Sequence, residues 1–242
     1  MGTFRDHFSG HANRYGDFRP RYPDALFAWL HAHAPAGLAW DCATGNGHAA
    51  TGLAAYRDVF ATDASDTQVA RAEAHPRVRY AVGTAYEAPA DALALVTVAQ
   101  ALHWFDAAPF FAEVTRVLVP GGLFCAWSYG LFEVDDAVDA VVGELYREVV
   151  GPFWPPERRH VEDGYATFPW PHPLLEVPSF TMAATWSADH VLGYLRTWSA
   201  SRRYVVHHGR DPVQAIEAPL RQAWGGDRAV RWPLTVRAWR RP

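Results

Sequence analysis

Short apolar runs alternate with longer amphipathic stretches through the first half of the chain. An apolar run of a few residues between turn signals is typical of a buried strand, and such runs predict strands at residues 38–41, 59–63, 77–82, 92–99 and 123–128. The intervening stretches have helical periodicity. They predict helices over 24–34 and 48–57, a helix capped by Ser65 or Asp66, and a helix over 106–119.

The pattern changes after Tyr129. Residues 134–150 predict one amphipathic, acidic helix. Residues 151–178 are too apolar for a linker and too rich in proline for regular structure, so we expect an ordered flap that packs over the core. Beyond the flap, the pattern predicts strands at 180–186 and 230–239, with one helix running from Ser187 towards Ser199 and another beginning near Asp211. Pro233 suggests that the last strand is an edge strand or carries a bulge.

This order of elements predicts an α/β fold. We expect a doubly wound, mostly parallel sheet of seven strands, with an aromatic and proline-rich flap inserted after the fifth strand. The length of 242 residues suits a single large α/β domain.

Composition excludes several other classes of protein. With 50% hydrophobic and 14% aromatic residues, the chain has too much apolar surface for intrinsic disorder. The longest apolar stretch, 93–105, is far shorter than the roughly 20 residues of a spanning helix. Residues 1–6 lack the apolar core of a secretory signal. We therefore expect a cytoplasmic protein without a membrane partner, as a monomer or a homodimer.

Charge and metal-ligating residues add little to this picture. The histidines do not have the spacing of a metal site, so we predict no bound metal. From Arg196 onward the chain carries ten arginines against three acidic residues. Because the net charge of the whole chain is −4, we interpret this basic stretch as a solvated face rather than a nucleic-acid site.

The segment 40–48 joins the first predicted strand to the first crossover helix, which is the usual ligand position in a doubly wound sheet. Gly45 and Gly47 let a ligand approach the backbone closely. With Ala50 they fit the dinucleotide fingerprint, and Asp63 lies near the distance expected for a ribose-binding acid. An NAD(P)-dependent oxidoreductase is therefore one candidate.

Asp41 favours a different ligand. It ends the first strand directly before the loop, where its carboxylate can hold a cationic amino-acid head group, while Asp63 can accept both ribose hydroxyls. Two carboxylates beside a glycine loop suit S-adenosylmethionine, which carries an ammonium and a sulfonium, and suit a pyrophosphate poorly. The alternative is that Asp41 only caps the next helix and Asp63 is a turn residue.

These motifs resemble the class I S-adenosylmethionine-dependent methyltransferases, and most of all the type 11 group related to trans-aconitate methyltransferase. The similar segments are the loop at 41–47, the acid Asp63, the stretch Gly83–Ala85, the octet 99–106, the turn 120–123 and the N-terminal residues 15–23. The resemblance implies that S-adenosylmethionine is bound and leaves as S-adenosylhomocysteine. The implied cofactor-binding residues are Tyr15, Arg19, Tyr22, Asp41, Ala43, Gly45, Gly47, Asp63, Ala64, Thr84, Ala85 and Gln100.

The same resemblance implies how the single domain is organised. Residues 1–35 would form an N-terminal cap, 36–130 the cofactor-binding core, 131–179 the flap and substrate region, and 180–242 the C-terminal strands and helices. In the sheet order of the family, the fourth strand separates Cys42 from Cys125 by about two strand spacings, which is too far for a disulfide.

Two residues depart from the pattern of the family. Ala43 replaces the first glycine of the loop, and Ala94 stands where an acid usually begins the fourth strand. A catalytically inactive S-adenosylmethionine-binding protein is therefore a further alternative.

The expected acceptor is a small molecule methylated on a carboxylate or hydroxyl oxygen, by in-line displacement in an aromatic pocket. His103 is the candidate catalytic base, although it could instead wall the cofactor site. Trp104, Trp127, Trp154 and Trp170 are expected to form a lid that excludes water. The expected substrate-binding residues are His103, Trp104, Tyr129, Trp154, Arg158 and Arg202.

Overall fold

The computed structural model describes residues 20–83 and 88–242. The predicted strands are present as β1 (Ala39–Cys42), β2 (Val59–Asp63), β3 (Val78–Val82), β4 (Leu93–Ala99), β5 (Leu118–Tyr129), β6 (Phe180–Trp186) and β7 (Arg228–Arg240). They form one sheet in the order β3-β2-β1-β4-β5-β7-β6, in which β7 runs in the direction opposite to the other six strands. The prediction of a doubly wound, mostly parallel α/β sheet is therefore confirmed.

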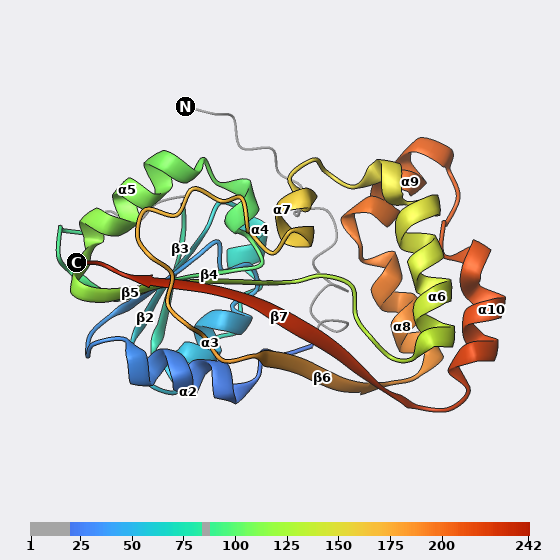
Figure 1. The fold of residues 1–242 in the computed structure, drawn as a ribbon, viewed down its shortest axis with the longest axis horizontal. Coiled ribbons are helices and arrows are strands. Elements are labelled where there is room, and N and C mark those ends of the chain that lie inside the picture. Colours follow the sequence, from blue (N-terminus) through green and yellow to red (C-terminus); the bar gives the residue numbers. More distant parts are fainter. Residues whose placement is uncertain (1–19, 84–87) are drawn as a thin grey trace.

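Helices cover both faces of this sheet (Figure 1). One face packs against α2 (Asp24–His33) and α3 (His48–Ala54), and the other against α5 (Ala107–Val117). Alternate residues of each strand enter the two cores, as Trp40 and Ala39 do on β1, because successive side chains of a strand point to opposite faces. The short α4 (Asp66–Val69) follows β2, and Ser65 caps it by accepting a hydrogen bond from the backbone N–H of Gln68.

The remaining helices gather beyond the sheet, at the right of Figure 1. This helical group consists of α6 (Asp136–Glu144), α8 (Ala188–Arg196), α9 (Ser199–His208) and α10 (Gln214–Trp224). It has an apolar core of its own, to which the end of β5 and the long strands β6 and β7 contribute. The sheet and the helical group therefore bury separate clusters of side chains.

The structure corrects four details of the sequence prediction. The expected helix over 134–150 ends as α6 and continues as a π-helical turn, η2 (Leu145–Val149). The flap is not irregular throughout, since it contains the 3-10 turn η3 (Gly151–Phe153) and the helix α7 (Arg158–Glu162). The helix from Ser187 stops at Arg196, and a separate helix, α9, follows it.

The fourth correction concerns Pro233. Its strand β7 is not an edge strand, because it lies between β5 and β6. The ladder with β5 ends at the pair of Tyr129 and Leu234, so Pro233 lies one residue beyond that ladder. The missing N–H of the proline therefore interrupts no pairing with β5.

The strand order also settles the position of the two cysteines. Cys42 is on β1 and Cys125 is on β5, and β4 separates the two strands. Both thiols are buried and free, and burial raises the pKa of each of them. Within residues 20–83 and 88–242, no helix is long and apolar enough to cross a membrane.

Candidate functional site

The carboxyl ends of β1, β2 and β4 bring the predicted ligand-binding loop to one edge of the sheet. β1 pairs directly with both neighbours, and Cys42 lies opposite Thr62 of β2 and Val98 of β4. The loop after β1 is therefore next to the turn after β2 and to the segment after β4. This is the edge at which ligands bind in open α/β sheets.

Asp41 lies beneath this loop. Its side chain is fully buried, and its carboxylate accepts hydrogen bonds from Thr44 Oγ1 at 2.5 Å and from Thr97 Oγ1 at 2.8 Å. Burial raises the pKa of Asp41 to about 6, and the two hydroxyl hydrogen bonds oppose this shift. Asp41 therefore links the loop to β4, and its direct contact with a ligand stays a prediction.

The backbone of the loop turns in the left-handed region at three positions. Ala43 has φ +56°, Gly45 has φ +59° and Gly47 has φ +87°. A side chain at Gly47 would collide with the ring of Tyr80, because an added Cβ would lie 2.2 Å from Oη. Above Gly45 the space is open for at least 4 Å among the described atoms, so the loop is accessible at its centre.

Asp63 holds the loop from the neighbouring strand. Its Oδ2 accepts the backbone N–H of Gly45 at 2.8 Å, and its Oδ1 accepts that of Ser65 at 2.8 Å. The side chain is only partly buried. A carboxylate can accept more than two hydrogen bonds, and the contact of Asp63 with ribose hydroxyls stays a prediction. Ala64 lies between Asp63 and Ser65 in the same turn.

Gln100 fixes the end of β4 against the end of β5. It has φ +55°, and its side-chain amide both donates to the carbonyl of Tyr129, at 3.0 Å, and accepts its N–H, at 2.8 Å. Its own N–H donates to the carbonyl of Trp127 at 2.7 Å. Gln100 therefore shapes the floor of the site through backbone contacts, and its predicted contact with the cofactor is untested.

A pocket of about 90 Å³ opens beside this floor, between the sheet and the helical group. The six predicted substrate-binding residues all line it, so the structure brings together side chains from four separate segments. Among the described residues that line the pocket, none is acidic and two are arginines. The full set is Gln100, His103, Trp104, Tyr129, Gly130, Leu131, Tyr146, Trp154, Arg158, Tyr194, Thr197, Trp198, Ser199 and Arg202.

Arg158 reaches the pocket from α7. Its guanidinium lies over the rings of Trp154, at 4.8 Å, and Tyr146, at 5.6 Å, and its Nε donates to Tyr146 Oη at 3.0 Å. Tyr146 Oη in turn donates to Glu162 at 2.6 Å. Stacking on rings fixes the guanidinium without pairing it directly with a carboxylate, so its two terminal nitrogens remain suited to an anion.

His103 belongs to the turn η1 (Leu102–Trp104) after β4. Its Nδ1 shares a hydrogen bond of 3.0 Å with Oη of Tyr165, and its ring lies 4.7 Å from that of Trp104. Burial, with further contributions from the nearby Arg158 and His160, lowers the pKa of His103 to about 3. The imidazole is therefore neutral and a weak base.

Four of the predicted cofactor-binding residues fall outside the described residues, namely Tyr15, Arg19, Thr84 and Ala85. Tyr22 packs edge-on against Trp127, with ring centroids 5.4 Å apart.

The proposed aromatic lid is only partly where we expected it. Trp104 and Trp154 line the pocket, whereas Trp127 is fully buried in the core beneath α2 and Trp170 packs on Phe111 of α5. Sequence reasoning missed Tyr146, Tyr194 and Trp198, which complete the aromatic wall. Their only signal in the sequence was the general abundance of aromatic residues.

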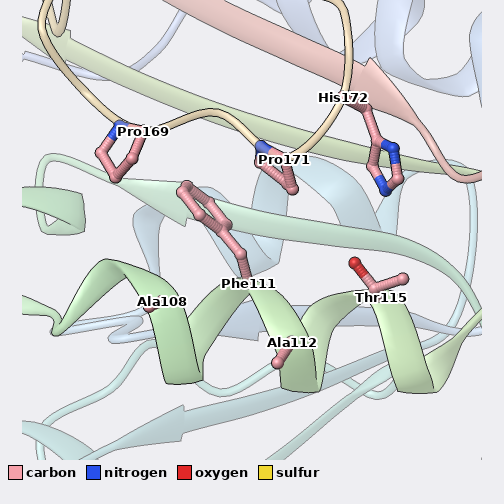
Figure 2. Close-up of a pocket in the computed structure, with 7 residues that line it drawn as sticks. All are labelled: Ala108, Phe111, Ala112, Thr115, Pro169, Pro171 and His172. Atoms are coloured by element: carbon pink, nitrogen blue, oxygen red, sulfur yellow. The ribbon is translucent and has the colours of Figure 1, made fainter.

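A second, wider groove of about 450 Å³ lies between α5 and the flap. Figure 2 shows Phe111 rising from α5 towards Pro169 and Pro171, with Thr115 opposite His172. Phe111 and His172 contact Phe124 and Trp239, which pair across β5 and β7. This groove is therefore over the middle of β5, away from the strand ends that carry the loop.

Many arginines of the basic C-terminal stretch are engaged within the protein. Arg203 and Arg237 donate to the backbone carbonyls of Phe153 and Gly164. Ion pairs join Arg196 to Asp211 and Glu217, Arg221 to Asp189 and Glu217, Arg228 to Asp135, and Arg241 to Asp91. The described part of the chain contains no cluster of three or more metal-ligating side chains.

Comparison with known proteins gives a consistent result. Residues 40–126 match the family model of a methyltransferase domain. A protein of Dictyostelium discoideum named as a methyltransferase is 31% identical over 229 residues, which cover 91% of this chain and 87% of that protein. A Mycobacterium tuberculosis protein, named as an uncharacterized methyltransferase, is 39% identical over 120 residues, which are 48% of this chain and 49% of that protein.

A solved structure extends the similarity to the whole fold. It is described as that of a type II methyltransferase from Anaeromyxobacter dehalogenans and is 47% identical in sequence. The superposition covers 92% of this chain and 97% of that chain, with a TM-score of 0.86. The similarity therefore includes the helical group and the flap as well as the glycine loop.

Proposed function

Since the chain belongs to the class I S-adenosylmethionine-dependent methyltransferases, we propose that it methylates a carboxylate oxygen of a small acid in the pocket beside the glycine loop. Family membership confirms the expectation of a methyltransferase and excludes the oxidoreductase alternative. The observation that carries the choice of acceptor is the guanidinium of Arg158, held over two rings in a pocket whose described lining has no acid.

The glycine loop fits the donor. Gly45 leaves open space above the backbone, and the partly exposed carboxylate of Asp63 can accept ribose hydroxyls while it holds the loop. We assign the adenosine side to Asp63 and Ala64, and the amino-acid side to the loop over Asp41. When bound, S-adenosylmethionine supplies an electrophilic methyl group, and a new C–O bond forms as the C–S bond breaks.

The chain's own residues then have three tasks. Arg158 and Arg202 attract and orient the anionic acceptor. The aromatic walls, including Trp104 and Trp154, exclude water and hold the acceptor for in-line attack. No residue has to remove a proton, because a carboxylate attacks in its ionised form. This agrees with the low basicity of His103, whose pKa is lowered to about 3.

The test uses methyl-labelled S-adenosylmethionine and a panel of aromatic and aliphatic carboxylic acids, with the matching alcohols and phenols. We expect labelled product only with acids, and mild alkali should release its label as methanol because it is an ester. Arg158→Gln should lower product formation about 10-fold or more, through loss of a charge-assisted hydrogen bond. Alkali-stable product, or product from alcohols or phenols alone, would contradict the proposal.

The matched control is Arg159→Gln. Arg159 is the neighbouring residue on α7, is exposed and does not line the pocket, so its removal should leave the yield unchanged. A loss of the same size in both variants would mean that general positive charge, rather than the position of Arg158, is what matters.

A further inference from the structure

Tyr165 lies in the core next to the pocket, and its backbone has an uncommon conformation. After α7 the chain takes two consecutive left-handed residues, Gly164 with φ +62° and Tyr165 with φ +57°. A bulky residue seldom adopts this conformation, because its Cβ lies close to backbone atoms. The phenol is fully buried, and its ring lies 5.4 Å from that of Phe168. The surrounding structure therefore holds Tyr165 in one place.

The phenol meets His103 from the side away from the pocket. Tyr165 is not among the residues that line the pocket, whereas His103 is. Since Tyr165 Oη lies 3.0 Å from Nδ1, the nitrogen of His103 that remains for a ligand in the pocket is Nε2. The question is which of the two nitrogens carries the proton.

The surroundings decide this question. Burial of the ring, with further contributions from the nearby Arg158 and His160, keeps His103 neutral, so the imidazole has one N–H. Burial raises the pKa of Tyr165 to about 12, so the phenol keeps its proton and must donate it. Nδ1 of His103 is within hydrogen-bond distance of the phenol oxygen, whereas Oγ of the nearby Ser128 makes no hydrogen bond with a described residue. The imidazole lone pair is therefore the acceptor of the phenol proton.

We propose that Tyr165 is a positioning residue that fixes the Nε2–H tautomer of His103, so that His103 binds the carboxylate of the acceptor as a hydrogen-bond donor. The identity of that acceptor rests on the proposed function. The tautomer itself does not, because it follows from contacts within the protein alone.

The first experiment measures the tautomer without any acceptor. Protein with ¹⁵N-labelled histidine is studied by long-range ¹H–¹⁵N NMR, and the signals of His103 are assigned as those that disappear in His103→Gln. We expect an unprotonated Nδ1 and a protonated Nε2 in the wild type. Tyr165→Phe should shift His103 towards a mixture of tautomers, while Tyr204→Phe, a buried tyrosine outside the pocket, should not. An Nδ1–H tautomer, or no change in Tyr165→Phe, would overturn the proposal.

The second experiment measures binding of benzoate and succinate to protein saturated with S-adenosylhomocysteine. Glutamine has an N–H donor but cannot act as a base, so His103→Gln should bind within about 3-fold of the wild type. His103→Ala should bind about 10- to 100-fold more weakly, as expected for a lost hydrogen bond to a charged group. Equal losses in the two variants would argue against a donor role.

The two experiments separate the inference from the proposed function. If the wild type binds neither acid but shows the Nε2–H tautomer, the carboxylate acceptor is wrong and the role of Tyr165 stands. If both acids bind and His103 carries its proton on Nδ1, the acceptor class stands and the positioning role of Tyr165 is wrong.

Discussion

Replacing Asp41 with asparagine should make the protein more stable at neutral pH, and the gain should grow with pH. Asp41 is fully buried, and both of its carboxylate oxygens accept a threonine hydroxyl. Asparagine has nearly the same shape. Its carbonyl oxygen can accept one hydroxyl and the backbone N–H of Ala50, which also donates to the carboxylate, and its amide can donate to the other threonine, whose oxygen also accepts. The substitution therefore removes the charge while keeping the packing.

The size of the effect follows from the pKa. In the folded protein burial raises the pKa of Asp41 from 3.8 to about 6, so the folded state holds this proton more tightly than the unfolded state. The stability that this group contributes is fully present below about pH 4 and is lost as the pH rises through 6. This difference in pKa between the folded and unfolded states corresponds to about 3 kcal/mol of folding free energy. Between pH 4.5 and 7.5 the stability difference between Asp41→Asn and the wild type should rise by about 2 kcal/mol.

Urea unfolding followed by tryptophan fluorescence at several pH values gives this difference. Burial also lowers the pKa of His103, His190 and His208, and these groups make each protein less stable as the pH falls. Their contribution is common to both proteins, so it cancels when the two stabilities are subtracted at each pH. Only the titration of Asp41 remains in the subtracted curve.

The control is Asp106→Asn, an exposed residue at the start of α5 whose side chain makes no capping hydrogen bond. It removes the same carboxylate charge from the protein surface, so a rise confined to Asp41→Asn reports on burial. A flat or falling curve for Asp41→Asn would refute the reasoning, because the buried carboxylate would then carry its charge at no cost in folding free energy.

Three further substitutions test the loop. Asp63→Ala should weaken binding of S-adenosylhomocysteine at least about 30-fold in calorimetry, because the N–H of Gly45 loses its acceptor and the proposed ribose contact is removed; unchanged affinity would contradict the proposed role of Asp63. Ala43→Gly should raise the free energy of unfolding by about 0.5–1 kcal/mol in urea, because it relieves a left-handed alanine; a loss of stability would contradict this. Gly47→Ala should lower it by about 2 kcal/mol or more, and adding Tyr80→Phe, which removes the nearest clashing atom, should restore part of that loss; no rescue would mean that the backbone conformation dominates.

The sequence predicted the sheet well because its parallel strands are buried on both faces. Such strands are nearly continuous apolar runs, and β4, with six of its seven residues buried, is the clearest example. The strands also end in short loops, so residues such as Asp41 and Asp63 could be assigned to one edge before the structure was known. Local pattern and global topology agree in this part of the chain.

The helical group was less predictable because tertiary contacts decide its boundaries. No glycine or proline marks the end of α8; instead Thr197 Oγ1 donates to the carbonyl of Tyr194, and Trp198 is buried between two helices. The wall residues Tyr146, in η2, and Trp198, between α8 and α9, come together only through tertiary packing, with ring centroids 5.6 Å apart. Similarly, only Gly164 hinted at the left-handed turn that carries Tyr165.

The position of β7 has a consequence for the order in which the molecule can assemble during synthesis. The donor loop uses strands from the first hundred residues, which the ribosome releases early. β6, by contrast, pairs with β7 and not with β5, and β7 follows every other described strand in the chain. The strand that joins β6 to the rest of the sheet is therefore the last of the described strands to be translated. Until it forms, α8 and α9 cannot take their final positions relative to β5. The nascent chain can therefore form the proposed donor loop well before the strands beside the pocket are complete.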